Sequence, residues 1–158
     1  MERRRVAGGS ADHRGDHAFL ILGLKGMVYV ELVARGASSD QHSMRAPSVP
    51  NPAWRLVWAL STLKTQDNRV AIDGFYDHVR PLTALEERAI DDIPADDAKL
   101  KAYFGIDAFL PGRVRDGYYY NLVAEPTCNI AGLVSGYTGE GTKTVLPSEA
   151  RAKVDMRL

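Results

Sequence analysis

The chain has 158 residues, which is enough to bury the core of one ordinary domain. Twenty basic side chains balance twenty acidic ones, so no net field favours nucleic acid or an anionic membrane as a partner. The single cysteine, Cys128, excludes an internal disulfide and fits a reducing compartment, and the only apolar run near the N-terminus, residues 18–22, is too short for a signal-peptide core or a membrane span. These features predict a cytoplasmic protein.

The N-terminal residues lack the apolar pattern of a packed element. Residues 1–17 are rich in Arg, Gly, Asp and His, so we expect a leader, residues 1–22, that is disordered or poorly docked. From residue 26, apolar side chains recur with a period of two. This pattern predicts a strand whose apolar face is formed by Val28, Val30, Leu32 and Ala34. A loop rich in Ser, Gly and Pro follows at residues 36–50.

A helix is predicted next, over residues 52–64. Asn51 supplies a capping side chain, and Pro52 suits the first helical position. The polar run at residues 66–68 ends the helix near Lys64, and a short strand is expected at residues 70–72. The helix has one apolar stripe with two tryptophans beside it: the stripe is Ala53, Leu56, Val57, Leu60 and Leu63, next to Trp54 and Trp58.

Residues 80–125 differ in character and predict a helical insertion. Thr83 and Glu86, three positions apart, have the spacing of a capping box, which opens one helix. The acidic pair at residues 96–97 predicts the start of a second helix, and Gly105 predicts its end.

The last third of the chain returns to strand patterns. Residues 127–134 are β-prone, and residues 136–141 form a glycine-rich turn. A final strand is predicted by strict alternation, with its apolar face formed by Ala150, Ala152, Val154, Met156 and Leu158. The expected fold class is therefore α+β, an antiparallel sheet with helices on one face, whose core unites Trp54, Leu60 and Val154.

Three motifs suggest chemistry. His13 and His17 have the spacing of a metal-binding pair on a helix, but their segment contains glycine and no apolar face, so a helix is not expected there. Residues 136–144 resemble a phosphate loop, yet Thr142 separates the last glycine from Lys143 and no helix can open behind it, which favours a tight turn. His42, in the loop after the first strand, is either a solvated surface residue or a group that polarises or protonates a ligand.

Longer stretches of the sequence resemble a known family. Residues 126–132, 136–147 and 152–158 closely resemble the lid domain of carnosinase-like dipeptidases. These enzymes belong to the aminoacylase, carboxypeptidase G and succinyl-diaminopimelate desuccinylase family of dinuclear zinc peptidases. The resemblance covers residues 23–158, and further motifs occur upstream in the family's order: Gly23-Leu-Lys-Gly26, Asp40-x-His-Ser43, Pro50-Asn-Pro52 and Gly74-Phe-Tyr-Asp77.

The resemblance implies a two-domain homodimer that hydrolyses dipeptides or N-acyl amino acids with two zinc ions in its catalytic domain. It implies a ferredoxin-like β-α-β-β-α-β lid that dimerises and helps to bind substrate. The family's lid histidine maps to His42, which acts on the scissile carbonyl or its oxyanion in the partner subunit's active site. The family's substrate-binding threonine and arginine map to Thr144 and Arg157, and an arginine fork suits a substrate carboxylate.

Three departures from the family pattern bear on function. The family loop after the histidine is glycine-rich, whereas residues 43–48 contain no glycine. The place of the family's metal-bearing aspartate falls on residues 8–10, which hold no carboxylate, and the chain stops before the second core helix and fourth strand of the lid. We therefore expect a fragment: an incomplete lid without a metal site or cofactor of its own, which pairs with a second copy or with a catalytic domain.

Two alternatives to this hypothesis stay open. The chain is a non-catalytic subunit that supplies His42, Thr144 and Arg157 to a separate catalytic chain, or it is the remnant of a decayed gene with no function of its own. In each case, the sequence predicts that the chain alone hydrolyses nothing and is only marginally stable, because an uncovered sheet leaves apolar surface and an unpaired strand edge.

Overall fold

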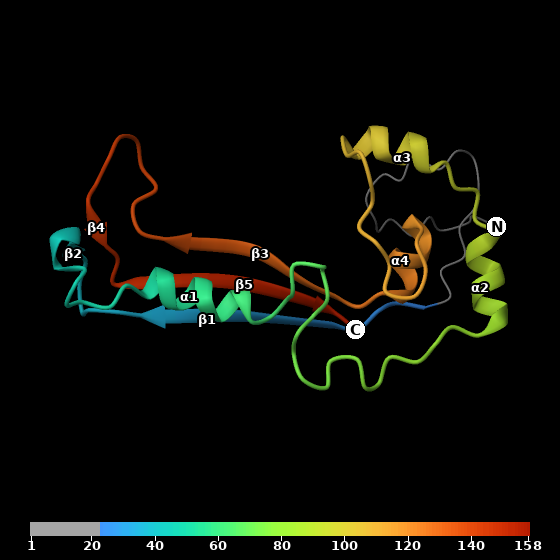
Figure 1. Ribbon diagram of the computed structural model, residues 1–158, viewed down its shortest axis with the longest axis horizontal. Coiled ribbons are helices and arrows are strands. Elements are labelled where there is room, and N and C mark those ends of the chain that lie inside the picture. Colours follow the sequence, from blue (N-terminus) through green and yellow to red (C-terminus); the bar gives the residue numbers. More distant parts are fainter. Residues whose placement is uncertain (1–22) are drawn as a thin grey trace, which may run out of the picture.

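A computed structural model describes residues 23–158, and the expected leader, residues 1–22, lies outside this range. Its centre is a three-stranded antiparallel sheet of β1 (Met27–Arg35), β3 (Thr127–Ser135) and β5 (Glu149–Arg157), in the order β1–β5–β3 (Figure 1). The strands predicted from the three alternating or β-prone runs are thus confirmed. The last strand of the chain lies between the other two, so both of its edges are hydrogen-bonded.

The register brings like side chains to the same face of the sheet. Val154 of β5 lies opposite Val30 of β1 and Ile130 of β3, so all three share the face that the helix covers. The pairing of β3 with β5 shifts between Ile130 and Gly132, where the intervening Ala131 forms a β-bulge. Beyond the bulge Leu133 lies opposite Ala152, on the helix-covered face.

One helix, α1 (Pro52–Ser61), packs on the sheet against β1 and β5. As predicted, the Asn51 side chain caps it, accepting a hydrogen bond from the Ala53 N–H at 2.8 Å, and proline occupies the first turn. The helix ends at Ser61, earlier than the predicted Lys64. The predicted strand at residues 70–72 is wrong: only a single bridge joins Val70 to Lys64.

The main core lies between α1 and the sheet. Leu60 and Val154 belong to it, as predicted, but Trp54 does not, since 58 % of its surface is exposed on the outer side of α1. The helix turns Leu56 and Leu60 towards the sheet and leaves both tryptophans exposed. The fully buried members of this core are Leu56, Leu60, Val70, Cys128, Ala150, Ala152 and Val154.

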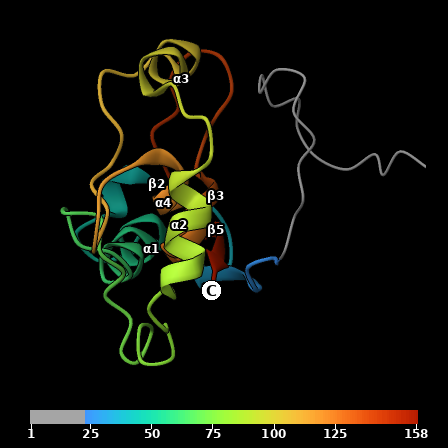
Figure 2. The same cartoon turned by 90° about the vertical axis from the view of Figure 1, so that its right-hand side faces the viewer.

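Three further helices gather beyond the end of the sheet near the C-terminus (Figures 1 and 2): α2 (Ala84–Asp91), α3 (Asp97–Phe104) and α4 (Tyr118–Ala124). The expectation that the helices cover one face of the sheet therefore holds for α1 alone. The predicted capping box at Thr83 is present, and Gly105 ends α3 in the left-handed conformation with φ 67°. A small separate core, Ile90, Tyr119 and Tyr120, holds this helical segment together.

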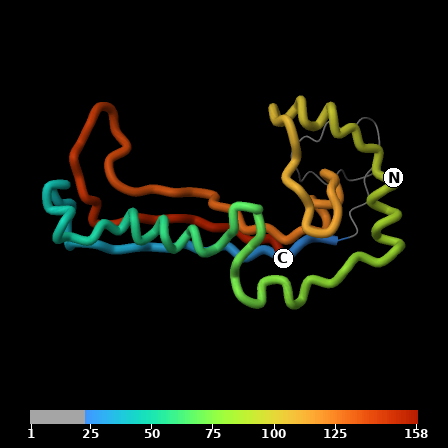
Figure 3. Tube along the Cα trace, in the orientation of Figure 1, coloured from blue at the N-terminus to red at the C-terminus, as the bar shows by residue number. Residues whose placement is uncertain are grey.

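Short elements complete the described part of the chain. β2 (Gln41–His42) pairs with β4 (Val145–Leu146), and a 3-10 turn, Ser43–Arg45, follows β2. Figure 3 follows the chain out of α1 through a long connection to α2. Within residues 23–158, no helix has the length and apolar character that crossing a bilayer requires.

The core position of Leu56 gives a first prediction. Leu56→Ala removes a side chain that is 2 % exposed, so we expect the free energy of unfolding to fall by about 2–5 kcal/mol. Urea denaturation measures the change. Leu85→Ala on α2 is the matched control because Leu85 is 75 % exposed, and equal losses for the two variants would contradict this account of the core.

Candidate functional site

His42 lies in the small β2–β4 sheet, at the end of the molecule opposite to α2, α3 and α4 (Figure 1). Two hydrogen bonds pin its loop to the segment before β5: the Asp40 carboxylate accepts from the N–H and the hydroxyl of Ser148, at 2.8 and 3.0 Å. These bonds favour the charged carboxylate and hold the pKa of Asp40 below its usual value. The Ser43 N–H also donates to the Thr144 carbonyl, at 3.2 Å. Two loops far apart in the sequence are thereby held together.

The orientation of the His42 ring is set by the turn that follows it. Its Nδ1 accepts a hydrogen bond from the Met44 N–H at 3.1 Å, as the cap of the 3-10 turn. A neutral imidazole whose Nδ1 accepts carries its proton on Nε2. That Nε2 lies 3.4 Å from Oγ1 of Thr144, and both side chains are exposed. The ring therefore presents an N–H donor beside a hydroxyl group.

The loop after His42 does not need the glycines that its family counterpart carries. In residues 23–158 the only non-glycine residue with a positive φ is Asn68, so every residue of the 43–48 loop has a backbone conformation that an ordinary side chain tolerates. The cap at His42 and the 3-10 turn fix the loop in place of a glycine-rich bend.

A recess of about 350 Å³ surrounds this pair of side chains. It includes Lys143, whose sequence context is only a poor match to a phosphate loop. The Lys143 ammonium lies 5.7 Å from the ring centroid of Tyr137. The predicted tight turn is instead a long loop, and residues 145–146 behind it form strand β4. The recess is lined by Asp40, Gln41, His42, Lys143, Thr144 and Val145.

Arg157 lies at the opposite end of β5, where it faces Met27 and Thr127 across the two ladders. It shares the uncovered face of the sheet with Lys153 and Asp155, and within residues 23–158 its guanidinium makes no ion pair. The strand from Glu149 to Arg157 spans roughly 27 Å at the usual rise per residue. The structure thus brings together two of the three predicted site residues, His42 and Thr144, and places the third far from them.

The residues that the structure describes do not fit a zinc pair. No three His, Cys, Asp or Glu side chains among residues 23–158 lie close enough together to hold a metal ion. A zinc site needs three or four such ligands at bonding distance. The histidine pair His13 and His17 lies outside the described residues.

Known proteins resemble most of this chain. The Cys-Gly metallodipeptidase DUG1 of Candida albicans is 29 % identical over 139 residues, covering 87 % of this chain and 28 % of that protein. The Beta-Ala-His dipeptidase of Rattus norvegicus is 26 % identical over 140 residues, covering 88 % of this chain and 28 % of that protein. The chain therefore spans less than a third of the length of these curated relatives.

A solved structure agrees with these relatives. The M20 family metallo-carboxypeptidase Sso-CP2 from Sulfolobus solfataricus superposes with a TM-score of 0.78 and 41 % identity, over 87 % of this chain and 36 % of that one. The family described as the peptidase dimerisation domain matches residues 22–158, which include every strand and helix described above. The chain belongs to the M20 peptidase dimerisation domain family.

Proposed function

We propose that this chain is the substrate-binding and dimerisation lid of a carnosinase-like M20 dipeptidase. The observation that carries the proposal is the meeting of His42 and Thr144, separated by 102 positions in the sequence, with Nε2 and Oγ1 3.4 Å apart in an open recess. These are the two residue types that the family places against the substrate. Relatives that act on Cys-Gly and β-Ala-His dipeptides support the substrate class.

We propose a ferredoxin-like lid with an insertion at about residues 80–125. The strand order β1–β5–β3 supports this topology, because the third core strand of that fold lies between the first and second. The helices α2, α3 and α4 support the insertion, since they have their own core and sit beyond the sheet rather than on it.

The hydrogen-bond donors of the three residues determine the chemistry that we propose for them. The Nε2–H of His42 donates to the scissile carbonyl oxygen, and the donation strengthens as negative charge develops on that oxygen. Thr144 orients the imidazole and offers its hydroxyl to the substrate. Arg157 binds the substrate carboxylate through both nitrogens of its fork. Its guanidinium is free to do so because it makes no ion pair within the described chain.

One protomer cannot bring these groups to one dipeptide. The length of β5, roughly 27 Å, separates the His42 end of the sheet from the Arg157 end, and a dipeptide is far shorter. A second copy related by a two-fold axis has its His42 end beside the first copy's Arg157 end. We therefore propose that each substrate meets Arg157 of one protomer and the His42 and Thr144 pair of the other.

The surface for this homodimer is the outer side of α1 together with the free edge of β3. Trp54 and Trp58 stack with ring centroids 6.0 Å apart, and they are 58 % and 61 % exposed. No strand of the described chain pairs with the outer edge of β3, and Leu133 and Val134 of this strand are also exposed. Exposed aromatic pairs and unpaired edges are typical of surfaces that another chain covers.

A catalytic domain is the second proposed partner. The relatives' name, metallodipeptidase, implies a metal. The resemblance to the carnosinase-like family implies that this metal is a pair of zinc ions. Since residues 23–158 do not provide the ligands, we propose that the zinc pair belongs to a catalytic domain outside this lid. The lid contributes binding and orientation of the substrate.

The dimer surface gives the second prediction. Trp58→Glu places a charge on the outer side of α1, so we expect sedimentation velocity to show monomers at concentrations where the unaltered chain is dimeric. The dimer dissociation constant should rise at least about tenfold, as for a central aromatic contact. Leu85→Glu adds the same charge to an exposed apolar position on α2 and should leave the dimer intact. Dissociation of both variants, or of neither, would refute this interface.

The third prediction concerns turnover by the full-length enzyme that contains this lid. His42→Ala should lower kcat about a hundredfold or more, because it removes a donor to the developing oxyanion. His78→Ala, at an exposed loop histidine, should leave kcat unchanged. Dipeptide hydrolysis under saturating substrate measures both. Near-normal turnover of the His42 variant would exclude the proposed role.

Mixing two inactive variants tests whether the site is shared between protomers. A dimer of one His42→Ala subunit and one Arg157→Met subunit has one site with both groups intact and one site with neither. Dissociating and mixing equal amounts should restore about a quarter of the unaltered rate, since half the dimers are mixed and half their sites are intact. No restoration in demonstrably mixed dimers would show that both groups serve the same protomer's site.

The fourth prediction concerns metal. Because residues 23–158 lack a ligand set, calorimetric titration of the purified chain with zinc should show no tightly bound pair of ions, and a dipeptide panel should show no hydrolysis. Two stoichiometric zinc ions, or zinc-dependent turnover by the chain alone, would overturn the division between lid and catalytic domain.

A further inference from the structure

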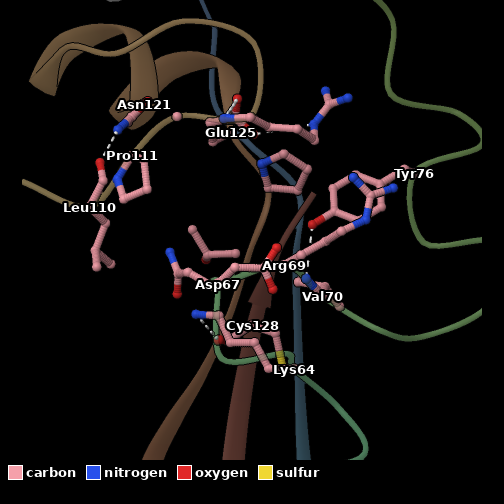
Figure 4. A pocket seen from close by; sticks show the side chains of 15 residues that line it. Lys64, Asp67, Arg69, Val70, Tyr76, Leu110, Pro111, Asn121, Glu125 and Cys128 are labelled. Carbon is pink, nitrogen blue, oxygen red and sulfur yellow. Dashed lines mark hydrogen bonds and ion pairs between the residues drawn. The ribbon is translucent and has the colours of Figure 1, made fainter.

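The two ends of the sheet are held in different ways. At the end near the C-terminus, side chains around a recess of about 450 Å³ join stretches that are far apart in the sequence (Figure 4). Lys64 donates there to the Cys128 carbonyl at 3.3 Å, and the Arg113 guanidinium lies 5.1 Å from the ring centroid of Tyr76. At the other end, the ladder of β2 and β4 contains only two residue pairs. A ladder of that length is marginally stable by itself, so the position of His42 depends on further contacts.

One residue of the chain holds both ends of the loop that leads to His42. The loop, residues 36–40, follows β1, and its first residue, Gly36, donates its N–H to the Ser148 carbonyl at 2.8 Å. Its last residue, Asp40, accepts through Oδ1 from the Ser148 N–H at 2.8 Å and from the Ser148 hydroxyl at 3.0 Å. Ser148 directly precedes β5, so the loop is fastened to the central strand of the sheet.

The carboxylate of Asp40 serves as a hydrogen-bond acceptor and not as the partner of a cation. Within residues 23–158 it forms no ion pair. The two bonds from Ser148 are the main reason why the pKa of Asp40 lies below its usual value, and the charge of Lys143 adds a smaller contribution. An amide oxygen accepts the same two bonds without carrying a charge. Asp40→Asn therefore separates the acceptor from the charge.

His42 is fixed from both sides. Asp40 holds the chain two residues before it, and the Ser43 N–H donates to the Thr144 carbonyl at 3.2 Å directly after it. A donor to an oxyanion is effective only when it is already in place, and a misplacement of about 1 Å costs about a hundredfold in rate. The bonds that fix the loop are therefore as important to the reaction as the donor itself.

We propose that Asp40 is a positioning residue for dipeptide hydrolysis. Its carboxylate holds the loop on Ser148 and so places Nε2 of His42 beside the scissile carbonyl, while Asp40 itself does not touch the substrate. This inference rests on the proposed role of His42. It adds a residue whose effect on the rate passes entirely through another side chain.

The test measures kcat and KM of the full-length enzyme that contains this lid. Asp40→Ala removes both bonds to Ser148, and we expect kcat to fall about tenfold while KM changes less than about threefold, because donor placement matters most in the transition state. Asp40→Asn keeps the acceptor and should retain at least about half of the unaltered kcat. Asp73→Ala removes a carboxylate from an exposed turn outside the recess around His42 and should leave both constants unchanged.

A double variant shows whether Asp40 acts through His42. Asp40→Ala combined with His42→Ala should be no slower than His42→Ala alone, since the group that Asp40 positions is already gone. A further loss of the same size as in Asp40→Ala alone would show that Asp40 acts independently, which overturns the inference. A kcat of Asp40→Asn as low as that of Asp40→Ala also overturns it, because the charge itself would then act on the substrate.

The same measurements distinguish failure of this inference from failure of the proposed function. Near-normal turnover of His42→Ala overturns both, whereas a slow His42→Ala enzyme beside an unaltered Asp40→Ala enzyme overturns the positioning role alone. Should Asp40→Ala unfold the enzyme, Ser148→Ala replaces it in both comparisons, because it removes the hydroxyl donor and keeps the backbone N–H. A Ser148→Ala kcat equal to that of the unaltered enzyme would then overturn the inference.

Discussion

The arrangement of the sheet depends on the central place of β5. Both edges of this strand are hydrogen-bonded, and its helix-facing side chains Ala150, Ala152 and Val154 are almost completely buried. Two of the three are alanines, which leave room for α1 to lie close to the sheet. A similar close approach occurs at the start of the helix, where a Cβ on Gly36 would lie only 2.8 Å from Cδ of Pro52. Small side chains at these contacts therefore decide how near the helix lies.

The same strand links the two ends of the candidate site. It starts beside the loop that pins His42 and Thr144, and it ends at Arg157. Because a strand is stiff, the distance between the two groups is fixed by its length and not by flexible loops. A fixed separation favours a site that is completed by a second copy. It also explains why two residues of the predicted trio meet in one protomer while the third does not.

Regular elements were predictable from the sequence, and short or long-range features were not. The alternation in β1 and β5, the Asn51 cap and the capping box at Thr83 each carry a local signal, and each element formed. Helix α4 was not predicted because it starts at Gly117 without a side-chain cap and its first residues are β-prone tyrosines. The two-residue strands β2 and β4 are too short to show a period, and the bond from Asp40 to Ser148 spans 108 residues, which no local pattern reveals. The exposure of Trp54 was not predictable either, because the apolar pattern of a helix does not show which of its apolar residues face the sheet.

The bulge at Ala131 determines how β3 can change length. Side chains alternate between the two faces of a strand, so an extra residue would reverse the face of everything that follows it unless a bulge absorbs it. With the bulge, Leu133 joins Ala152 on the helix-covered side. Deletion of Ala131 would leave Ile130 opposite Val154 and Gly132 opposite Lys153, so the ladder would become regular and every side chain would keep its face. The pairs on either side of Ala131 hold the register of β3, whereas the loop of residues 136–144 lies outside the ladder, so related lids can diverge in length there around a constant edge.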